Sequence, residues 1–198
     1  QTHTMAEHSL WQMTLGEFRD AIESRSMPGC GAAAASSAAI GLALVLKGLR
    51  ISESKAACAE RARLIERADA QLAALGDYAD EDVQAFNAYL AARRDTADEG
   101  ALQAAVERIN RVPVDTARCC LEALELAVAA RGLTRESLHS DTDAGARLLH
   151  SGLAMVLLNV DANVRNLDDA GEREALARTR EQLQTAADHA LERLSASG

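Results

Sequence analysis

The sequence contains few aromatic residues and few prolines. Of its 198 residues, 3% are Phe, Trp or Tyr, and the two prolines are Pro28 and Pro113. Because proline interrupts helices, so low a content leaves room for long unbroken ones. The hydrophobic fraction is 48%, much of it Ala and Leu, the strongest helix formers. No useful length of chain alternates apolar and polar residues as a strand does. An all-α protein with closely packed helices is therefore predicted.

Lysine is also scarce, and negative charge is in excess. Lys47 and Lys55 are the only lysines, and the formal net charge is −9. General nucleic-acid binding requires clustered cations on the phosphates, so this composition argues against a nucleic-acid partner. An acidic balance is ordinary for a soluble cytoplasmic protein, and we expect the chain in the cytoplasm.

Paired cysteine motifs are absent. The four cysteines are Cys30, Cys58, Cys119 and Cys120, with no CxxC spacing and with the histidines far away in sequence. Structural zinc sites usually show close paired ligand spacings, so no metal site is predicted. We expect free, buried thiols, as in a reducing compartment.

Signals for secretion and membrane insertion are weak. Residues 1–11 lack the basic and apolar regions of a signal peptide. Residues 1–13 are expected to form an N-terminal arm that is loose in its first residues. The longest apolar run, residues 32–46, is shorter than the ~20 residues that span a bilayer, so no membrane partner is expected. Its lack of charge instead predicts a helix buried on almost every side.

Start and stop signals predict a single domain, residues 14–198, with about eight helices. The expected ranges are 14–25, 32–49, 52–75, 80–94, 98–111, 113–131, 141–166 and 172–196. Thr14 and Glu17 form a capping-box pair, while Gly76 and Pro113 are interpreted as helix boundaries. A central helix of small residues indicates close helix contact, inside the chain or across a subunit boundary, and a homodimer is expected.

The stretch "SMPGCGAAAASSAAIGLALVL", residues 26–46, has a glycine turn before this central helix. Gly29 and Gly31 flank Cys30, yet the pattern fits neither GxxxxGK[ST] nor GxGxxG. Backbone N–H groups at such a helix start can bind an anion or a polar ligand. Simple tight packing of the turn is the alternative that the residues leave open.

Four segments, in order, resemble the cyclodeaminase/cyclohydrolase family of folate enzymes. They are "TLGEFRDAIES…MPGCGAAAASSAAIGLALVLKGL", "DVQAFNAYLAARR", "VPVDTARCCLEALELA" and "SDTDAGARLLHSGLAMVLLNVDANVRNLDD", and they cover residues 14–169. The resemblance implies an all-helical dimer that opens or closes the methenyl bridge between N5 and N10 of tetrahydrofolate. Cyclohydrolases add water to this bridge, and cyclodeaminases form it with release of ammonia. The implied partner is a folate-type small molecule, with no metal or cofactor beyond tetrahydrofolate as substrate.

The resemblance assigns the acid/base role to Asp82. Water attack on the methenyl carbon needs a base, and ring opening needs a proton returned to nitrogen. On a helix Asp82, Phe86 and Tyr89 share one face, and an apolar neighbourhood there raises the pKa of a carboxyl group. The alternative is that Asp82 belongs to a solvated acidic helix start in "DYADED".

The same resemblance implies substrate binding by several other residues. These are Gly29, Cys30, Gly31, Phe86, Asp141, Asn159 and Asn163. Asn159, Asn163 and Asn166 form a row in an apolar segment, where buried amides need partners. Those partners are either the pterin edge or a neighbouring helix. Asp141 most simply caps the helix that follows it, and His150 is expected in the core or at an interface.

The chain also departs from the family pattern. Cys30 replaces the middle glycine of the family turn, and the family lysines after two of the helices are missing. Arg50, Arg93 and Arg94 offer charge near these places, although Arg and Lys differ in geometry and proton transfer. Two functions therefore stay open. One is a folate cyclohydrolase or cyclodeaminase, and the other is a non-catalytic helical dimer that binds a small molecule or a protein partner.

Overall fold

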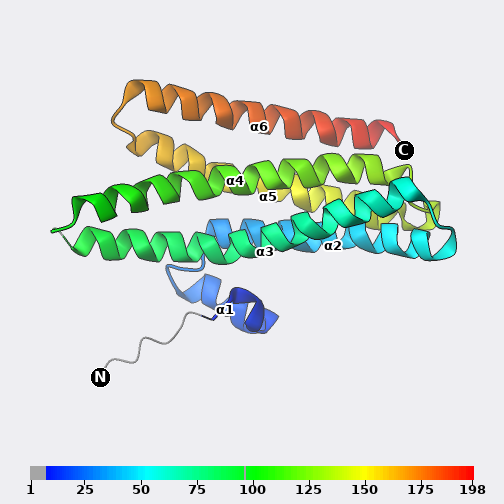
Figure 1. Ribbon diagram of the computed structural model, residues 1–198, viewed down its shortest axis with the longest axis horizontal. Helices are drawn as coiled ribbons and strands as arrows, with labels where there is room; N and C mark the ends of the chain where they lie inside the picture. The colour runs from blue at the N-terminus through cyan, green and yellow to red at the C-terminus, as the bar shows by residue number, and fades with distance from the viewer. Residues whose placement is uncertain (1–7, 96) are drawn as a thin grey trace.

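The computed structural model describes residues 8–95 and 97–198, which form a bundle of long helices (Figure 1). The described residues contain six α-helices, two short 3-10 helices and no strand, so the all-α prediction is confirmed. The elements are η1 (Leu10–Gln12), α1 (Leu15–Ser24), α2 (Cys30–Lys55), α3 (Ala59–Arg94), α4 (Glu99–Arg131), η2 (Glu136–Leu138), α5 (His139–Asn166) and α6 (Ala170–Ala196).

The predicted count of about eight helices is too high because two expected breaks do not occur. α3 continues through Gly76, and α4 continues through Pro113. An interior glycine costs a helix about 1 kcal/mol relative to alanine, and an interior proline removes one backbone hydrogen bond. Both helices pack against neighbours along much of their length, and this tertiary packing outweighs the local cost.

α1 begins as predicted but stands apart from the bundle (Figure 1). Thr14 Oγ1 accepts from the Glu17 N–H at 3.0 Å, and the Glu17 carboxylate accepts from the Thr14 N–H at 3.0 Å. Only Ala21 of this helix is buried, while Leu15 remains 81% exposed. The apolar side chains of Leu15 and Ile22 on α1 are therefore exposed.

The end of the N-terminal arm is attached to α3. Ser9 Oγ and the Leu10 N–H donate to the two carboxylate oxygens of Asp80 at 2.6 and 2.7 Å. Trp11 Nε1 donates to the carbonyl oxygen of Gly76 at 3.0 Å. These contacts hold residues 9–11 against α3, and the loose first residues that the sequence predicts fall on residues 1–7, outside the described part of the chain.

α2 is the central helix, as its composition predicts. The helix extends beyond the apolar run to Lys55, and it is long and apolar enough to span a membrane. However, 67% of its most apolar window is buried inside the bundle. This burial identifies α2 as a core helix.

α2 and α5 cross so closely that glycine is required at the contact. A Cβ on Gly41 would lie 2.7 Å from the Gly145 carbonyl oxygen, and one on Gly152 would lie 2.9 Å from the Ala34 carbonyl oxygen. Real Cβ atoms essentially never approach other atoms this closely. The close contact predicted for the small-residue helix therefore exists inside this chain.

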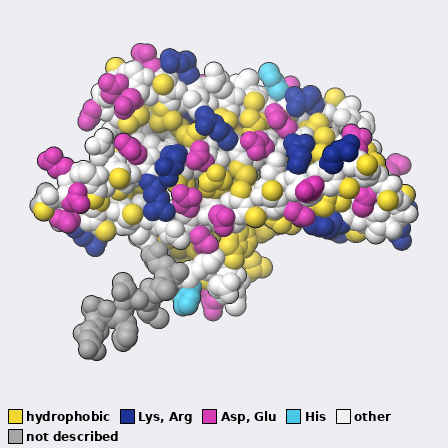
Figure 2. Space-filling model, viewed as in Figure 1, with side chains coloured by type: hydrophobic (Ala, Val, Ile, Leu, Met, Phe, Trp, Pro, Cys, Tyr) yellow, Lys and Arg dark blue, Asp and Glu magenta, His cyan; other side chains and the backbone are white. Residues whose placement is uncertain are grey.

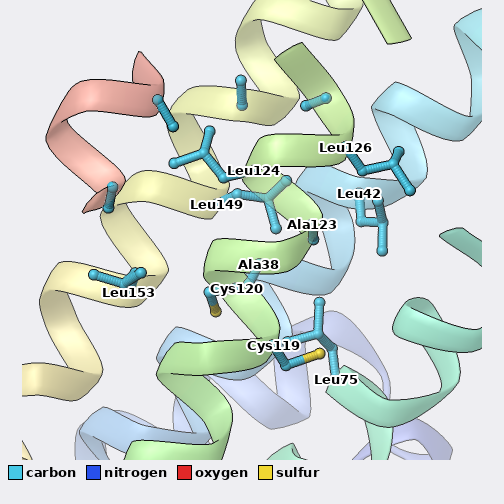
Figure 3. Packing of buried hydrophobic residues seen from close by; sticks show 14 of the residues in the cluster. Ala38, Leu42, Leu75, Cys119, Cys120, Ala123, Leu124, Leu126, Leu149 and Leu153 are labelled. Atoms are coloured by element: carbon cyan, nitrogen blue, oxygen red, sulfur yellow. The ribbon is translucent and has the colours of Figure 1, made fainter. Parts of the chain in front are cut away.

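Leucines of five helices, α2 to α6, contribute to the core, which also contains two vicinal cysteines (Figure 3). Cys119 and Cys120 are both buried, and burial raises the pKa of the Cys119 thiol to about 11. By contrast, Cys58 is half-buried and Cys30 is exposed. All four thiols are free, but the expectation that all are buried is wrong for these two.

Candidate active site

A cavity of about 370 Å³ lies where the start of α2 meets α3, α4 and α5. It brings together all the predicted site residues except one. They are Gly29, Cys30, Gly31, Asp82, Phe86, Asn159 and Asn163. The antiparallel course of α2 and α5 places the glycine turn beside the C-terminal half of α5, where the asparagines are. Cys30 Sγ, for example, lies 3.4 Å from the carbonyl oxygen of Met155.

The carboxylate of Asp82 lies against the first turn of α2. A Cβ on Gly31 would collide with the carboxylate, and the Ala32 N–H donates a hydrogen bond to it. Glycine at position 31 therefore allows α3 to bring a charged group directly to a helix N-terminus. The alternative of a solvated helix start is wrong for Asp82, because α3 begins at Ala59.

Burial changes the acidity of this carboxyl group. It raises the pKa of Asp82 from 3.8 to about 6, although the hydrogen bond from the Ala32 N–H acts in the opposite direction. Burial disfavours the charged form, whereas an N–H donor favours it. At pH 7 the group is mostly ionised, with a pKa close enough to neutrality for it to accept and return a proton.

Aromatic rings continue the face of α3 on which Asp82 lies. Phe86 and Tyr89 both line the cavity, and their ring centroids are 6.5 Å apart. Cys30 also lines the cavity, and although its side chain is exposed overall, partial burial of the thiol together with the charge of Asp82 raises its pKa. The thiol is therefore neutral near pH 7, and Asp82 is the cavity group with acid/base character.

The asparagine row of α5 contacts the cavity, with Asn159 and Asn163 half-buried and Asn166 exposed. Asn159, Asn163 and Asn166 all line it. Asn163 Nδ2 also donates to the carbonyl oxygen of Ile109 on α4 at 2.9 Å. For Asn163 the inter-helix bond is thus observed, and it holds the amide at the cavity wall.

Asp141 lies apart from the other predicted site residues. It forms an ion pair with Lys47 at 2.9 Å, near the opposite end of α2 from the cavity. The expectation that it caps α5 is also wrong, because α5 begins two residues earlier, at His139. His150 joins α5 to α6, with Nε2 2.8 Å from an Asp188 oxygen.

Sequence reasoning did not find the wall that α4 contributes. Ile109, Val112 and Pro113 of α4 line the cavity. Apolar side chains do not by themselves indicate a binding site. The break expected at Pro113 also placed these residues in separate segments, whereas they belong to the continuous helix α4. Within residues 8–95 and 97–198, no three His, Cys, Asp or Glu side chains gather as a metal site would require.

Comparisons with known proteins agree with this arrangement. The family model described as formiminotransferase-cyclodeaminase matches residues 14–182. A methenyltetrahydrofolate cyclohydrolase of Methylorubrum extorquens is 33% identical, over 79% of this chain and 81% of that protein. The crystal structure of a formiminotetrahydrofolate cyclodeaminase from Thermotoga maritima has the same fold. It matches with a TM-score of 0.84 and 24% identity, covering 94% of this chain and 96% of that one. The family model covers most of this chain, and the cyclohydrolase is one-third identical to it. This chain therefore belongs to the formiminotransferase-cyclodeaminase family.

Proposed function

We propose that this protein is a folate one-carbon enzyme that opens or closes the methenyl bridge of tetrahydrofolate. The observation that carries the proposal is the carboxylate of Asp82, half-buried at a helix start with a pKa of about 6. The surrounding cavity, about 370 Å³, falls within the roughly 300–1,000 Å³ typical of small-molecule sites. The family relatives named for the two bridge reactions support the same class of chemistry.

Of these two reactions, we propose the addition of water. At neutral pH Asp82 is mostly ionised, and a carboxylate in this state is a base. It accepts a proton from the water whose oxygen bonds to the methenyl carbon, and its charge stabilises the cationic bridge. As the bond between that carbon and N5 breaks, N5 gains a proton and the oxygen loses one. The product is 10-formyltetrahydrofolate, with one proton released to solvent overall.

The remaining cavity residues position the substrate. In this proposal the turn Gly29–Gly31, Phe86 and the amides of Asn159 and Asn163 enclose the pterin and the atoms of the bridge. Backbone N–H groups and amides suit a ring edge rich in donors and acceptors. The reaction uses these groups and tetrahydrofolate as the one-carbon carrier, with no further cofactor.

The test is the absorbance of 5,10-methenyltetrahydrofolate mixed with purified protein, followed across pH. We expect accelerated loss of the methenyl band, with an enzymatic rate that rises through about pH 6 and then levels, because protonated Asp82 is not a base. Uncatalysed hydrolysis is subtracted at each pH. A flat profile across this range would remove Asp82 from the base role. Release of ammonia from a formimino substrate without bridge opening would favour the cyclodeaminase reaction, and neither activity would favour a non-catalytic binding protein.

We also propose that the protein is a homodimer, with a second copy covering the apolar surface beside α1. Trp11, Leu15 and Ile40 are 45%, 81% and 49% exposed. Figure 2 shows hydrophobic side chains gathered where α1 joins the bundle. A groove of about 350 Å³ there is lined by Trp11, Ala39, Ile40, Ala43, Leu72 and Gly76. Contiguous exposed apolar surface of this kind marks interaction sites.

Ile40→Asp is expected to convert the dimer to a folded monomer, because it places a charge in an apolar contact. Sedimentation velocity measures the change in mass, and circular dichroism checks that the helices persist. Ala175→Asp, on the exposed surface of α6, is the matched control and should remain dimeric. A wild-type protein that sediments as a monomer would contradict the proposal.

A further inference from the structure

A second cavity of about 450 Å³ adjoins the active-site cavity. Tyr89, Ile109, Asn163 and Asn166 line both of them. The second cavity adds Arg93 from the last turn of α3. Because they share these walls, the two cavities form one elongated groove between α3, α4 and α5.

Along this groove α3 presents an ordered series of side chains. Asp82, Phe86, Tyr89 and Arg93 follow one another at i, i+4, i+7 and i+11, which places them on one face of the helix. From the first to the last, the helix rises roughly 16 Å. The groove therefore presents a carboxylate at one end, two aromatic rings in the middle and a guanidinium group at the other end.

The guanidinium group of Arg93 lines the second cavity and not the first. Its central carbon is 5.6 Å from the centroid of the Tyr89 ring, within the range of a cation–π contact. Other arginines of the protein form ion pairs, such as Arg131 with Asp143 at 2.9 Å. In the described part of the chain, no carboxylate lies within ion-pair distance of Arg93. Its charge is thus directed at the groove without an internal anion to neutralise it.

We propose that the second cavity binds the glutamate end of the folate substrate, with Arg93 as the residue that recognises its carboxylates. This inference rests on the proposed function. The charge order of the groove matches the charge order of the substrate. The cationic methenyl bridge lies at Asp82, the aminobenzoyl ring lies along Phe86 and Tyr89, and the anionic glutamate reaches Arg93. The opposite orientation would place the carboxylates against Asp82, where like charges repel.

A simpler role for Arg93 would be to stabilise the end of α3. Cations are favourable in the last turn of a helix, where the backbone carbonyls carry partial negative charge. Arg94 occupies the same turn and has the same charge, but it lines neither cavity. Comparing variants of these two neighbouring arginines therefore distinguishes substrate recognition from helix stabilisation.

The kinetic test compares Arg93→Ala with Arg94→Ala. Charge-assisted hydrogen bonds contribute about 1.5–3 kcal/mol, so Arg93→Ala should raise KM for 5,10-methenyltetrahydrofolate roughly 10- to 100-fold with little change in kcat. Arg94→Ala should match the wild type. With methenyltetrahydropteroamide, which ends in a neutral amide in place of the glutamate, Arg93→Ala and the wild type should behave alike. Equal effects of the two arginine variants, or an equal loss with both substrates, would overturn the proposal.

A binding experiment keeps this inference separate from catalysis. The fragment p-aminobenzoylglutamate is titrated into each protein by calorimetry. We expect wild type and Arg94→Ala to bind it and Arg93→Ala to bind it at least tenfold more weakly. If the protein binds the fragment through Arg93 but does not open the bridge, the glutamate site is supported and the proposed reaction is wrong. If the protein opens the bridge but Arg93→Ala binds the fragment as tightly as the wild type, the glutamate site is wrong and the proposed reaction stands.

Discussion

Asp82→Asn is expected to lower the rate of methenyl-bridge opening by a factor of about 10²–10⁴, the usual contribution of a positioned general base. The amide keeps the shape of the carboxyl group and can still accept the hydrogen bond from the Ala32 N–H. It cannot take a proton from water near neutral pH. The absorbance assay at pH 7 and above measures the loss. A variant that retains the wild-type rate would place the base elsewhere.

The same substitution should make the folded protein more stable at neutral pH. The pKa of Asp82 is raised from 3.8 to about 6 on folding, so between these pH values the folded state binds more protons than the unfolded state. The free energy of unfolding of the wild type therefore falls as pH rises through this window. Above it, the ionised carboxylate costs roughly 2–3 kcal/mol, which the neutral amide avoids.

Denaturant unfolding at two pH values measures this effect. At pH 7 the Asn variant should exceed the wild type in stability, and near pH 4, where the carboxyl group is protonated in the folded protein, the two should converge. Asp77→Asn, at an exposed position on the same helix, is the matched control and should change stability by less than about 0.5 kcal/mol. Loss of activity together with loss of stability at pH 7 would instead indicate a structural role for Asp82.

Gly31→Ala is expected to abolish most of the activity by displacing the same carboxylate. The new Cβ would occupy the space of the Asp82 carboxyl group, so this group must move and its hydrogen bond with Ala32 is disturbed. A displacement of about 1 Å in a catalytic group can reduce a rate roughly 10²-fold. Gly132→Ala is the control, because a Cβ there has no heavy atom within 4 Å. Its activity should equal that of the wild type.

A double-mutant cycle tests whether the contact with Asp82 is the reason that position 31 requires glycine. In the wild-type background, the overpacking at Gly31→Ala should destabilise the fold by about 1–3 kcal/mol. In an Asp82→Ala background the colliding group is gone, so the same substitution should be nearly neutral. Unfolding of all four proteins gives the interaction energy. An equal cost in both backgrounds would show that another contact, unrelated to Asp82, constrains this position.

Much of the fold could be predicted because its signals are local. The capping pair of Thr14 and Glu17 and the helical spacing of Asp82, Phe86 and Tyr89 depend only on neighbouring residues. The prediction of a helix boundary at Gly76 is wrong because it too rests on local sequence. The local preference of this glycine indicates a break, but the packing that keeps α3 continuous comes from distant segments.

The parts of the site that escaped prediction depend on long-range geometry. Asp141 belongs to a segment that resembles the family, yet the antiparallel course of α2 and α5 places it beside Lys47. The spacing within α3 predicts that the pKa of Asp82 is raised. How far it is raised depends on how deeply α3 packs against the start of α2, a contact that requires Gly31. Sequence spacing within one helix cannot supply the distance between two helices.

The close crossing of α2 and α5 also determines how the substrate range of this enzyme can be redesigned. Larger side chains at Gly41, Gly145 or Gly152 would collide with backbone atoms of the other helix. Substitutions at these positions therefore cannot be used to adjust the distance between α2 and α5. The glycine turn and the asparagine row consequently form a fixed half of the groove. A variant library that seeks new substrates is best confined to the face of α3 that carries Phe86 and Arg93, where side chains can change while the frame stays intact.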